Sequence, residues 1–182
     1  IAQGWDVVLT REPGGTRLGE LLRTELLSGG SLAPMAELFL FGADRAQHVD
    51  ELIRPTVEAG GAVICDRFSD STFAYQHFGR GLPLHAVEAV CRVAGGGLRP
   101  DITFVLDVSV EEGLARARGR GLFDRFEDAE LAFHERVREG YMELARLEPE
   151  RVHIIAPGAV EEVWEDVEQA LSKFLEERRA PG

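Results

Sequence analysis

Side chains suited to phosphate, sugar and base binding gather in four short stretches of this 182-residue chain. Guanidinium groups bind phosphate oxygens in a two-pronged geometry, carboxylates bind Mg²⁺, and aromatic rings stack on flat ligands. Their combination points to nucleotide chemistry. The stretches are T-R-E-P-G-G-T at 10–16, L-F-L-F-G-A-D-R at 38–45, D-R-F-S-D-S-T-F-A-Y-Q at 66–76, and an arginine- and glycine-rich segment at 116–125.

The first stretch follows the apolar run 7–10, which predicts a strand. Open α/β sheets place their ligands at the carboxyl ends of strands, where Arg11 and Glu12 would lie. This charged pair is suited to holding a phosphate and a sugar hydroxyl. The alternative is an ordinary tight loop between a strand and a helix, since Pro and Gly favour turns.

The second stretch places Phe41 and Arg45 four residues apart in a predicted helix. Residues at this spacing share one helix face. A ring beside a guanidinium offers a nucleobase a stacking surface and a hydrogen-bond donor. The alternative is a core phenylalanine next to a surface arginine, which is common on amphipathic helices.

The third stretch begins where the apolar run 62–65 ends. Asp66 is placed as a carboxylate that binds Mg²⁺ directly or through water, and Arg67 beside it is suited to clamping phosphate oxygens. The following helical turn is crowded with hydroxyl and amide groups, contributed by Ser71, Thr72, Tyr75 and Gln76.

The fourth stretch is the densest positive segment of the chain. Glycine-flanked loops can close over an anion, whereas arginines at a helix end can simply favour the C-terminal dipole. Both interpretations stay open from the residues alone. The arginines concerned are Arg116, Arg118, Arg120 and Arg125.

Four apolar runs alternate with helical patterns, an order that predicts an α/β protein with a mainly parallel sheet. Each run is nearly continuous in apolar residues, as strands covered on both faces should be. Pro55 should interrupt the long second helix because it lacks an amide donor. The predicted strands are 7–10, 62–65, 102–107 and 152–155, and the helices 17–27, 35–59, 70–78, 84–94, 110–118, 126–147 and 160–178.

Composition excludes several classes of protein. The net charge of −12 argues against a nucleic-acid or anionic-membrane binder, and no apolar run approaches a membrane span. Cys65 and Cys91 lack metal-ligand spacing, which favours reduced thiols in the cytoplasm. The only lysine among 20 basic residues is Lys173, so no G-x-x-x-x-G-K-[ST] phosphate loop lies within these residues.

Together the first three stretches, the G-R-G-L at 79–82 and the R-x-R-x-x-x-D-R-F-E at 118–127 resemble the bacterial thymidylate kinase family, in order and over nearly the whole chain. The resemblance implies a three-layer P-loop fold with a five-stranded parallel sheet. It implies one kinase domain over 1–182 with a lid at about 117–127. It also implies transfer of the γ-phosphoryl of ATP to dTMP with Mg²⁺ in a cytoplasmic homodimer.

The resemblance also assigns roles to individual residues. It implies that Phe41 stacks on thymine, that Arg45 donates to thymine O4, and that Thr72 and Gln76 meet its N3 edge. It further implies that Arg67 binds the dTMP phosphate, Arg23 adds a pocket arginine, Glu12 lies by the deoxyribose and the metal, and Tyr75 crowds the 2′ position, with Arg116, Arg118, Arg120 and Arg125 in the lid.

One part of the family pattern is absent: the phosphate loop, its lysine and the central strand before it. Only four of the five strands are therefore expected here, and we expect about 30 further residues upstream, roughly one strand–loop–helix unit. Two alternatives stay open. The chain is a different nucleoside or nucleotide kinase, or it is a non-catalytic nucleotide-binding module.

Overall fold

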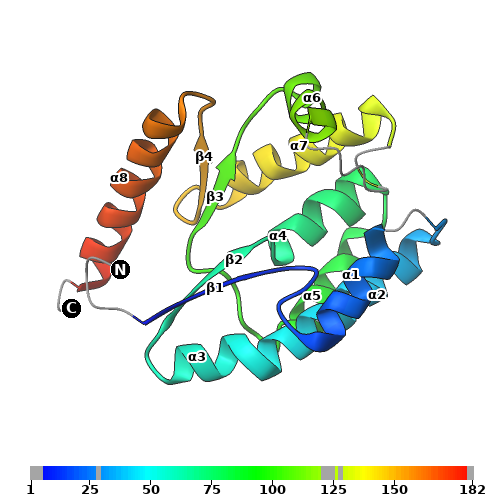
Figure 1. The fold of residues 1–182 in the computed structure, drawn as a ribbon, viewed down its shortest axis with the longest axis horizontal. Helices are drawn as coiled ribbons and strands as arrows, with labels where there is room; N and C mark the ends of the chain where they lie inside the picture. The colour runs from blue at the N-terminus through cyan, green and yellow to red at the C-terminus, as the bar shows by residue number, and fades with distance from the viewer. Residues whose placement is uncertain (1–5, 28–29, 120–125, 127–128, 180–182) are drawn as a thin grey trace.

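A computed structural model describes residues 6–27, 30–119, 126 and 129–179. Strands and helices alternate along the chain (Figure 1), close to the predicted ranges. Their order is β1 (Val7–Arg11), α1 (Arg17–Leu27), α2 (Pro34–His48), η1 (Val49–Ile53), α3 (Arg54–Glu58), β2 (Ala62–Asp66), α4 (Ser69–Thr72), η2 (Phe73–Gly79), α5 (Leu84–Ala94), β3 (Thr103–Leu106), α6 (Val110–Gly119), α7 (Leu131–Leu147), β4 (Val152–Ile155) and α8 (Val160–Arg179).

The four strands form two parallel pairs. β1 pairs with β2 from Val7↔Ala62 to Arg11↔Asp66, and β3 pairs with β4 from Thr103↔Val152 to Leu106↔Ile155. Within the described ranges no strand ladder joins one pair to the other. The predicted α/β class and the parallel pairing are confirmed.

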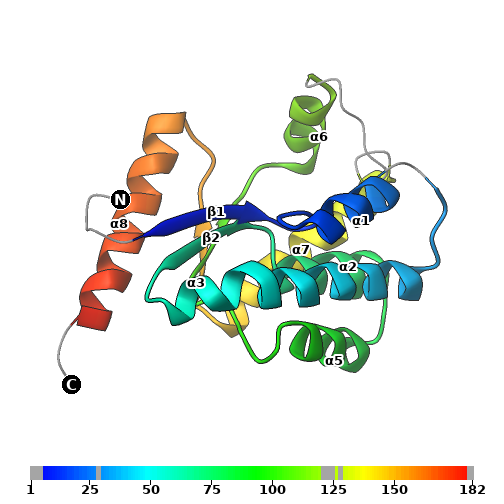
Figure 2. The same ribbon diagram turned by 60° about the horizontal axis from the view of Figure 1, so that its bottom comes forward.

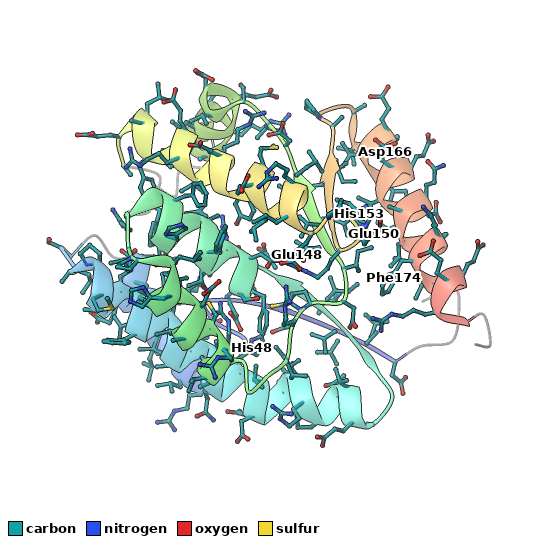
Figure 3. All side chains as sticks on the ribbon, turned by 180° about the vertical axis from the view of Figure 1, so that it is seen from behind. His48, Glu148, Glu150, His153, Asp166 and Phe174 are labelled. Carbon is teal, nitrogen blue, oxygen red and sulfur yellow. The ribbon has the colours of Figure 1, made fainter. Side chains whose placement is uncertain are left out.

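Side chains link the two strand pairs. Arg151, just before β4, donates from Nη1 and Nη2 to Asp70 on α4 at 2.7 and 2.9 Å. Thr103, at the start of β3, donates to the same carboxylate at 2.8 Å. Arg151 also donates from Nε to Glu148 at 2.8 Å, and Figure 3 shows Glu148 near the middle of the molecule. Asp70 therefore ties the helix after β2 to β3 and β4.

α2, η1 and α3 form one continuous helical rod beneath the first strand pair (Figure 2). Pro34 starts the rod, where its missing amide costs nothing. The predicted interruption at Pro55 takes the form of the wide π-helical turn η1, in which Arg54 N–H bonds to the carbonyl of Val49. Such turns are often found at functional sites, and here the regular part before it carries the second sequence stretch.

α7 packs closely on η2 and fixes its position. One face of α7 is buried at helical spacing, and glycines allow the two backbones to approach. A Cβ on Gly140 would lie 3.0 Å from Ala74 Cα, and one on Gly79 would lie 2.6 Å from Phe133 Cε2. η2 in turn carries much of the third stretch. The buried positions of α7 are Phe133, Val137, Gly140 and Leu144.

No helix in the described part of the chain has the length and apolar content needed to cross a bilayer.

Candidate active site

The first and third sequence stretches meet at the carboxyl ends of β1 and β2. Arg11 and Asp66 are paired in the strand register, and Glu12 N–H donates to the Asp66 carbonyl at 2.9 Å. The parallel pairing thus brings together charged residues more than 50 positions apart. This is the position at which open α/β sheets bind ligands.

Glu12 lies at the centre of a buried polar cluster. Arg45 donates to Glu12 Oε2 from Nε at 2.9 Å and from Nη2 at 2.8 Å. His48 Nδ1 lies 3.0 Å from Glu12 Oε1, and its Nε2 lies 2.8 Å from Thr10 Oγ1. Since a carboxylate only accepts, Nδ1 is the donor. Arg45 Nη2 also donates to Thr72 at 2.9 Å, which joins the second stretch to the third.

His48 and Asp44 are site residues that the sequence reasoning missed. The five histidines of the chain are dispersed without metal-ligand spacing, which gave His48 no role. Helical spacing was the signal that could have identified them. Asp44 and His48 lie one turn apart on α2, on either side of Arg45 in the sequence, so they share one helix face. Figure 3 shows His48 on the side of the molecule formed by α2 and α5, away from His153 on β4.

The side chain of Asp44 is fully buried, and only one of its two carboxylate oxygens accepts a hydrogen bond within the described residues. Its Oδ1 accepts the Gly14 amide at 3.1 Å, whereas Oδ2 has no partner among the described residues. The pKa of Asp44 is raised from 3.8 to about 6. Burial is the main cause and the charge of Glu12 adds to it, whereas the Gly14 hydrogen bond, His48 and Arg45 partly offset the rise. Its charged form is therefore costly near neutral pH.

Replacing Asp44 by asparagine should raise the free energy of unfolding at pH 8 by about 1–3 kcal/mol, since two pKa units correspond to about 3 kcal/mol. The pKa of Asp44 is higher in the folded protein than in the unfolded chain, so as the pH falls the folded protein binds this proton before the unfolded chain does. The advantage of Asp44→Asn should therefore shrink below pH 6 and vanish near pH 4. Urea unfolding between pH 4 and 8 measures this.

The matched control is Asp50→Asn, at an exposed position on η1. Its difference from the parent protein should stay flat over the same pH range. An Asp44→Asn difference that is equally flat contradicts the assignment of a raised pKa to Asp44.

Arg67 has an unusual backbone at the end of β2. Its φ is 71°, a left-handed conformation found at no other described non-glycine residue. Such strain costs about 1 kcal/mol or more and gathers at functional sites. The guanidinium lies 4.9 Å from the centre of the Tyr75 ring, and the Tyr75 hydroxyl raises the pKa of Arg67, which stays protonated.

The aromatic side of the site is closed by Phe126. Its ring centre lies 6.1 Å from that of Phe41 and 5.7 Å from that of Tyr75, and all three pack against one apolar cluster with Phe133. The two rings predicted to contact base and sugar therefore lie together, from α2 and η2. Phe126 belongs to the predicted lid segment.

Ser71 and Gln76, the remaining predicted residues of the third stretch, each form a hydrogen bond with a side chain of another helix. Ser71 Oγ lies 2.8 Å from the hydroxyl of Tyr141 on α7, and burial raises the pKa of Tyr141 to about 12. Gln76, at 1% exposure, donates from Nε2 to Glu37 at 2.9 Å. Glu37 was not predicted as a site residue from the sequence. A single glutamate in the first turn of a helix usually serves only to interact with the positive end of the helix dipole.

Two arginines of the site support the loop after β1. Arg23 Nη1 donates to the Pro13 carbonyl at 2.9 Å. Arg11 is exposed and donates to Glu20 on α1 at 2.9 Å. The loop itself contains a cis Glu12–Pro13 bond and has a φ of 77° at Gly15, where a Cβ would lie 2.5 Å from Thr10 Oγ1.

Asp66 and Glu12 differ as possible metal ligands. Asp66 is exposed at the end of β2, so its carboxylate fits an oxygen-liganded Mg²⁺. Both oxygens of Glu12 already accept hydrogen bonds from Arg45 and His48. No cluster of three or more metal-binding side chains occurs within the described ranges.

The predicted lid falls largely outside the described residues. Arg116 lies on α6 and donates to Glu112 one turn earlier. Arg120 and Arg125, and the side chain of Arg118, lie outside the described part of the structure.

Parallel strands with arginines and a buried polar cluster at their carboxyl ends are typical of α/β nucleotide-binding proteins, and the similarity to a solved nucleotide kinase places the chain in the P-loop fold class. The thymidylate kinase family model matches residues 1–167. The chain therefore belongs to the thymidylate kinase family, and the predicted kinase fold and kinase activity are confirmed at the family level.

Known members support this. The chain is 51% identical to the thymidylate kinase of Desulfovibrio desulfuricans over 187 aligned residues, covering 97% of this chain and 86% of the relative. It is 49% identical to that of Trichodesmium erythraeum, covering 94% and 78%. The crystal structure of thymidylate kinase from Ehrlichia chaffeensis superposes with a TM-score of 0.75 at 34% identity, over 91% of this chain and 81% of that one.

Proposed function

We propose that this protein transfers the γ-phosphoryl group of ATP to dTMP, giving dTDP and ADP. The observation that carries the proposal is the buried hydrogen bond between Arg45 and Thr72 at 2.9 Å, one helical turn along α2 from Phe41, whose ring packs against the neighbouring apolar cluster. Arg45 Nη1 meets only the weakly accepting Cys91 sulfur, at 3.6 Å, among the described residues. It is therefore the donor available to the O4 oxygen of a thymine stacked on Phe41.

Arg67 binds the phosphate of dTMP in this proposal. It lies at the end of β2, beside the ring of Tyr75 that packs against the sugar. Phosphoryl transfer depends mainly on positioning and charge neutralisation, so arginines supply much of the catalysis. Arg118, Arg120 and Arg125 of the lid neutralise the transferred group.

Mg²⁺ bound near Asp66 would neutralise charge on the phosphates of ATP. Asp66 fits because its carboxylate is exposed at the strand end next to Arg67. Arg11 and Arg23 keep the loop after β1 in place, Ser71 anchors α4 to α7, and Gln76 meets the base edge.

We also propose a cytoplasmic homodimer of a single kinase domain. Both described cysteines are free thiols, as expected in a reducing compartment. Met35 and Phe39 lie four residues apart on α2 and are exposed, Phe39 at 58%, so they offer an apolar face to a second copy.

An ADP-release assay with dTMP, dUMP, dCMP and AMP tests the proposal. The expected result is that dTMP gives the highest kcat/KM. A preference for dCMP or AMP would assign the protein to another nucleotide kinase activity. Calorimetric binding of dTMP without turnover would favour the non-catalytic alternative.

A further inference from the structure

The amide of Gln76 is held in one orientation by a buried carboxylate. Gln76 Nε2 donates to Glu37 Oε1 at 2.9 Å, and the residues are 1% and 0% exposed. Arg80 donates to both oxygens of Glu37, from Nε and Nη2, each at 3.1 Å. Glu37 lies in the first turn of α2, whereas Gln76 and Arg80 lie one turn apart on and just after η2.

The chemistry of Glu37 decides which end of the Gln76 amide faces it. A carboxylate has acceptors only, whereas an amide offers NH₂ at one end and C=O at the other. The NH₂ must therefore face Glu37, and Oε1 must point away from it. No hydrogen bond to Gln76 Oε1 occurs among the residues that the structure describes.

Arg80 holds Glu37 in this arrangement. Its two hydrogen bonds place a guanidinium against both oxygens of the buried carboxylate, which would be costly to bury without a partner. The guanidinium also lies 4.7 Å from the centre of the Phe133 ring and 5.4 Å from that of Phe126. Glu37 is thus held by a group that is itself packed between aromatic rings.

We propose that Glu37 is a specificity-determining positioning residue, which orients the Gln76 amide so that only an acceptor faces the base. The proposal rests on the proposed function, in which Gln76 meets the N3 edge. Thymine carries a hydrogen at N3 and would donate to Gln76 Oε1. Cytosine has an acceptor at N3, which would face a second acceptor. Uracil also carries the N3 hydrogen, so Glu37 discriminates cytosine but not uracil.

The test is Glu37→Gln, assayed for kcat/KM with dTMP, dUMP and dCMP. The amide introduced at this position can either accept from or donate to Gln76, so the Gln76 amide becomes free to reverse. The ratio of dTMP to dCMP should fall by about tenfold or more, because an unpaired buried polar group discriminates strongly. The ratio of dTMP to dUMP should stay unchanged. A merely structural role would lower all three values together and leave both ratios unchanged.

The matched control is Glu51→Gln. Glu51 accepts Gln47 Nε2 at 2.9 Å, the same pairing in an exposed position. This variant should keep both ratios of the parent protein.

A compensating swap provides the second variant. Glu37→Gln combined with Gln76→Glu exchanges the two groups, so that a carboxylate again presents an acceptor at position 76. The swap should restore a preference for dTMP over dCMP, and it carries the test alone if Glu37→Gln melts below the assay temperature. A swap without that preference, or an unchanged ratio in a folded Glu37→Gln protein, overturns the proposal. A parent protein that does not phosphorylate dTMP instead overturns the proposed function.

Discussion

Replacing Glu12 by leucine should lower the free energy of unfolding by about 3–5 kcal/mol. The substitution removes the acceptor of two hydrogen bonds from Arg45 and one from His48, and it leaves the Arg45 charge buried at 1% exposure. Breaking a buried pair from one side is strongly destabilising because the remaining charge is uncompensated. Urea unfolding followed by circular dichroism measures the loss.

Two further variants separate this cause from simple loss of packing. Glu20→Leu removes an exposed pair with Arg11 and should cost less than about 1 kcal/mol. The double variant Glu12→Leu with Arg45→Met removes both charges and should recover most of the stability, since apolar replacement of a whole buried pair is often neutral. If the double variant is as unstable as Glu12→Leu with Arg45 intact, the buried charge is not the cause.

Replacing Arg67 by glycine should lower kcat/KM for dTMP by about 10²- to 10³-fold, the usual cost of losing one group that stabilises developing charge. Stability should change by less than about 1 kcal/mol. Glycine adopts a φ of 71° without strain, and this relief offsets its larger loss of backbone entropy. Steady-state kinetics and thermal melting on the same samples give the two quantities.

Arg67→Lys serves as the charge-preserving comparison. It keeps a cation but loses the planar fork that binds two phosphate oxygens at once. Its activity should therefore lie between those of the parent and of Arg67→Gly. If Arg67→Gly keeps activity within threefold of the parent, another group binds the dTMP phosphate.

Much of the fold follows from local patterns. The four apolar runs become β1 to β4 almost residue for residue, because short β-branched and apolar runs bounded by turn residues favour strands. The prediction that both faces of the strands are covered is not met within the described residues, since Leu9, Ile64 and Leu106 are exposed. The meeting of Arg11 and Asp66 also follows, since carboxyl ends of parallel strands share one edge. The π-helical turns η1 and η2 did not follow, because one extra residue per turn barely changes an apolar periodicity.

The buried polar contacts were harder to foresee. The partners of Glu12, Glu37 and His48 lie 33 to 43 residues away. Charged residues are usually exposed, so the sequence alone gives no sign that such a residue is buried beside a distant partner. Likewise, Phe126 in an arginine-rich segment gave no sign that its ring would pack on Phe41. The positions that motif spacing brings together could be predicted, whereas the buried contacts that hold them in place required the structure.

The link at Asp70 has a consequence for how the chain assembles. Asp70 and Arg151 are 81 residues apart, so their contact closes a long loop whose entropy must be lost before the ion pair stabilises anything. Contacts of such separation slow folding. The ion pair can therefore stabilise the protein only once β4 lies beside α4, and together with the packing of α7 on η2 it sets the spacing between the two strand pairs.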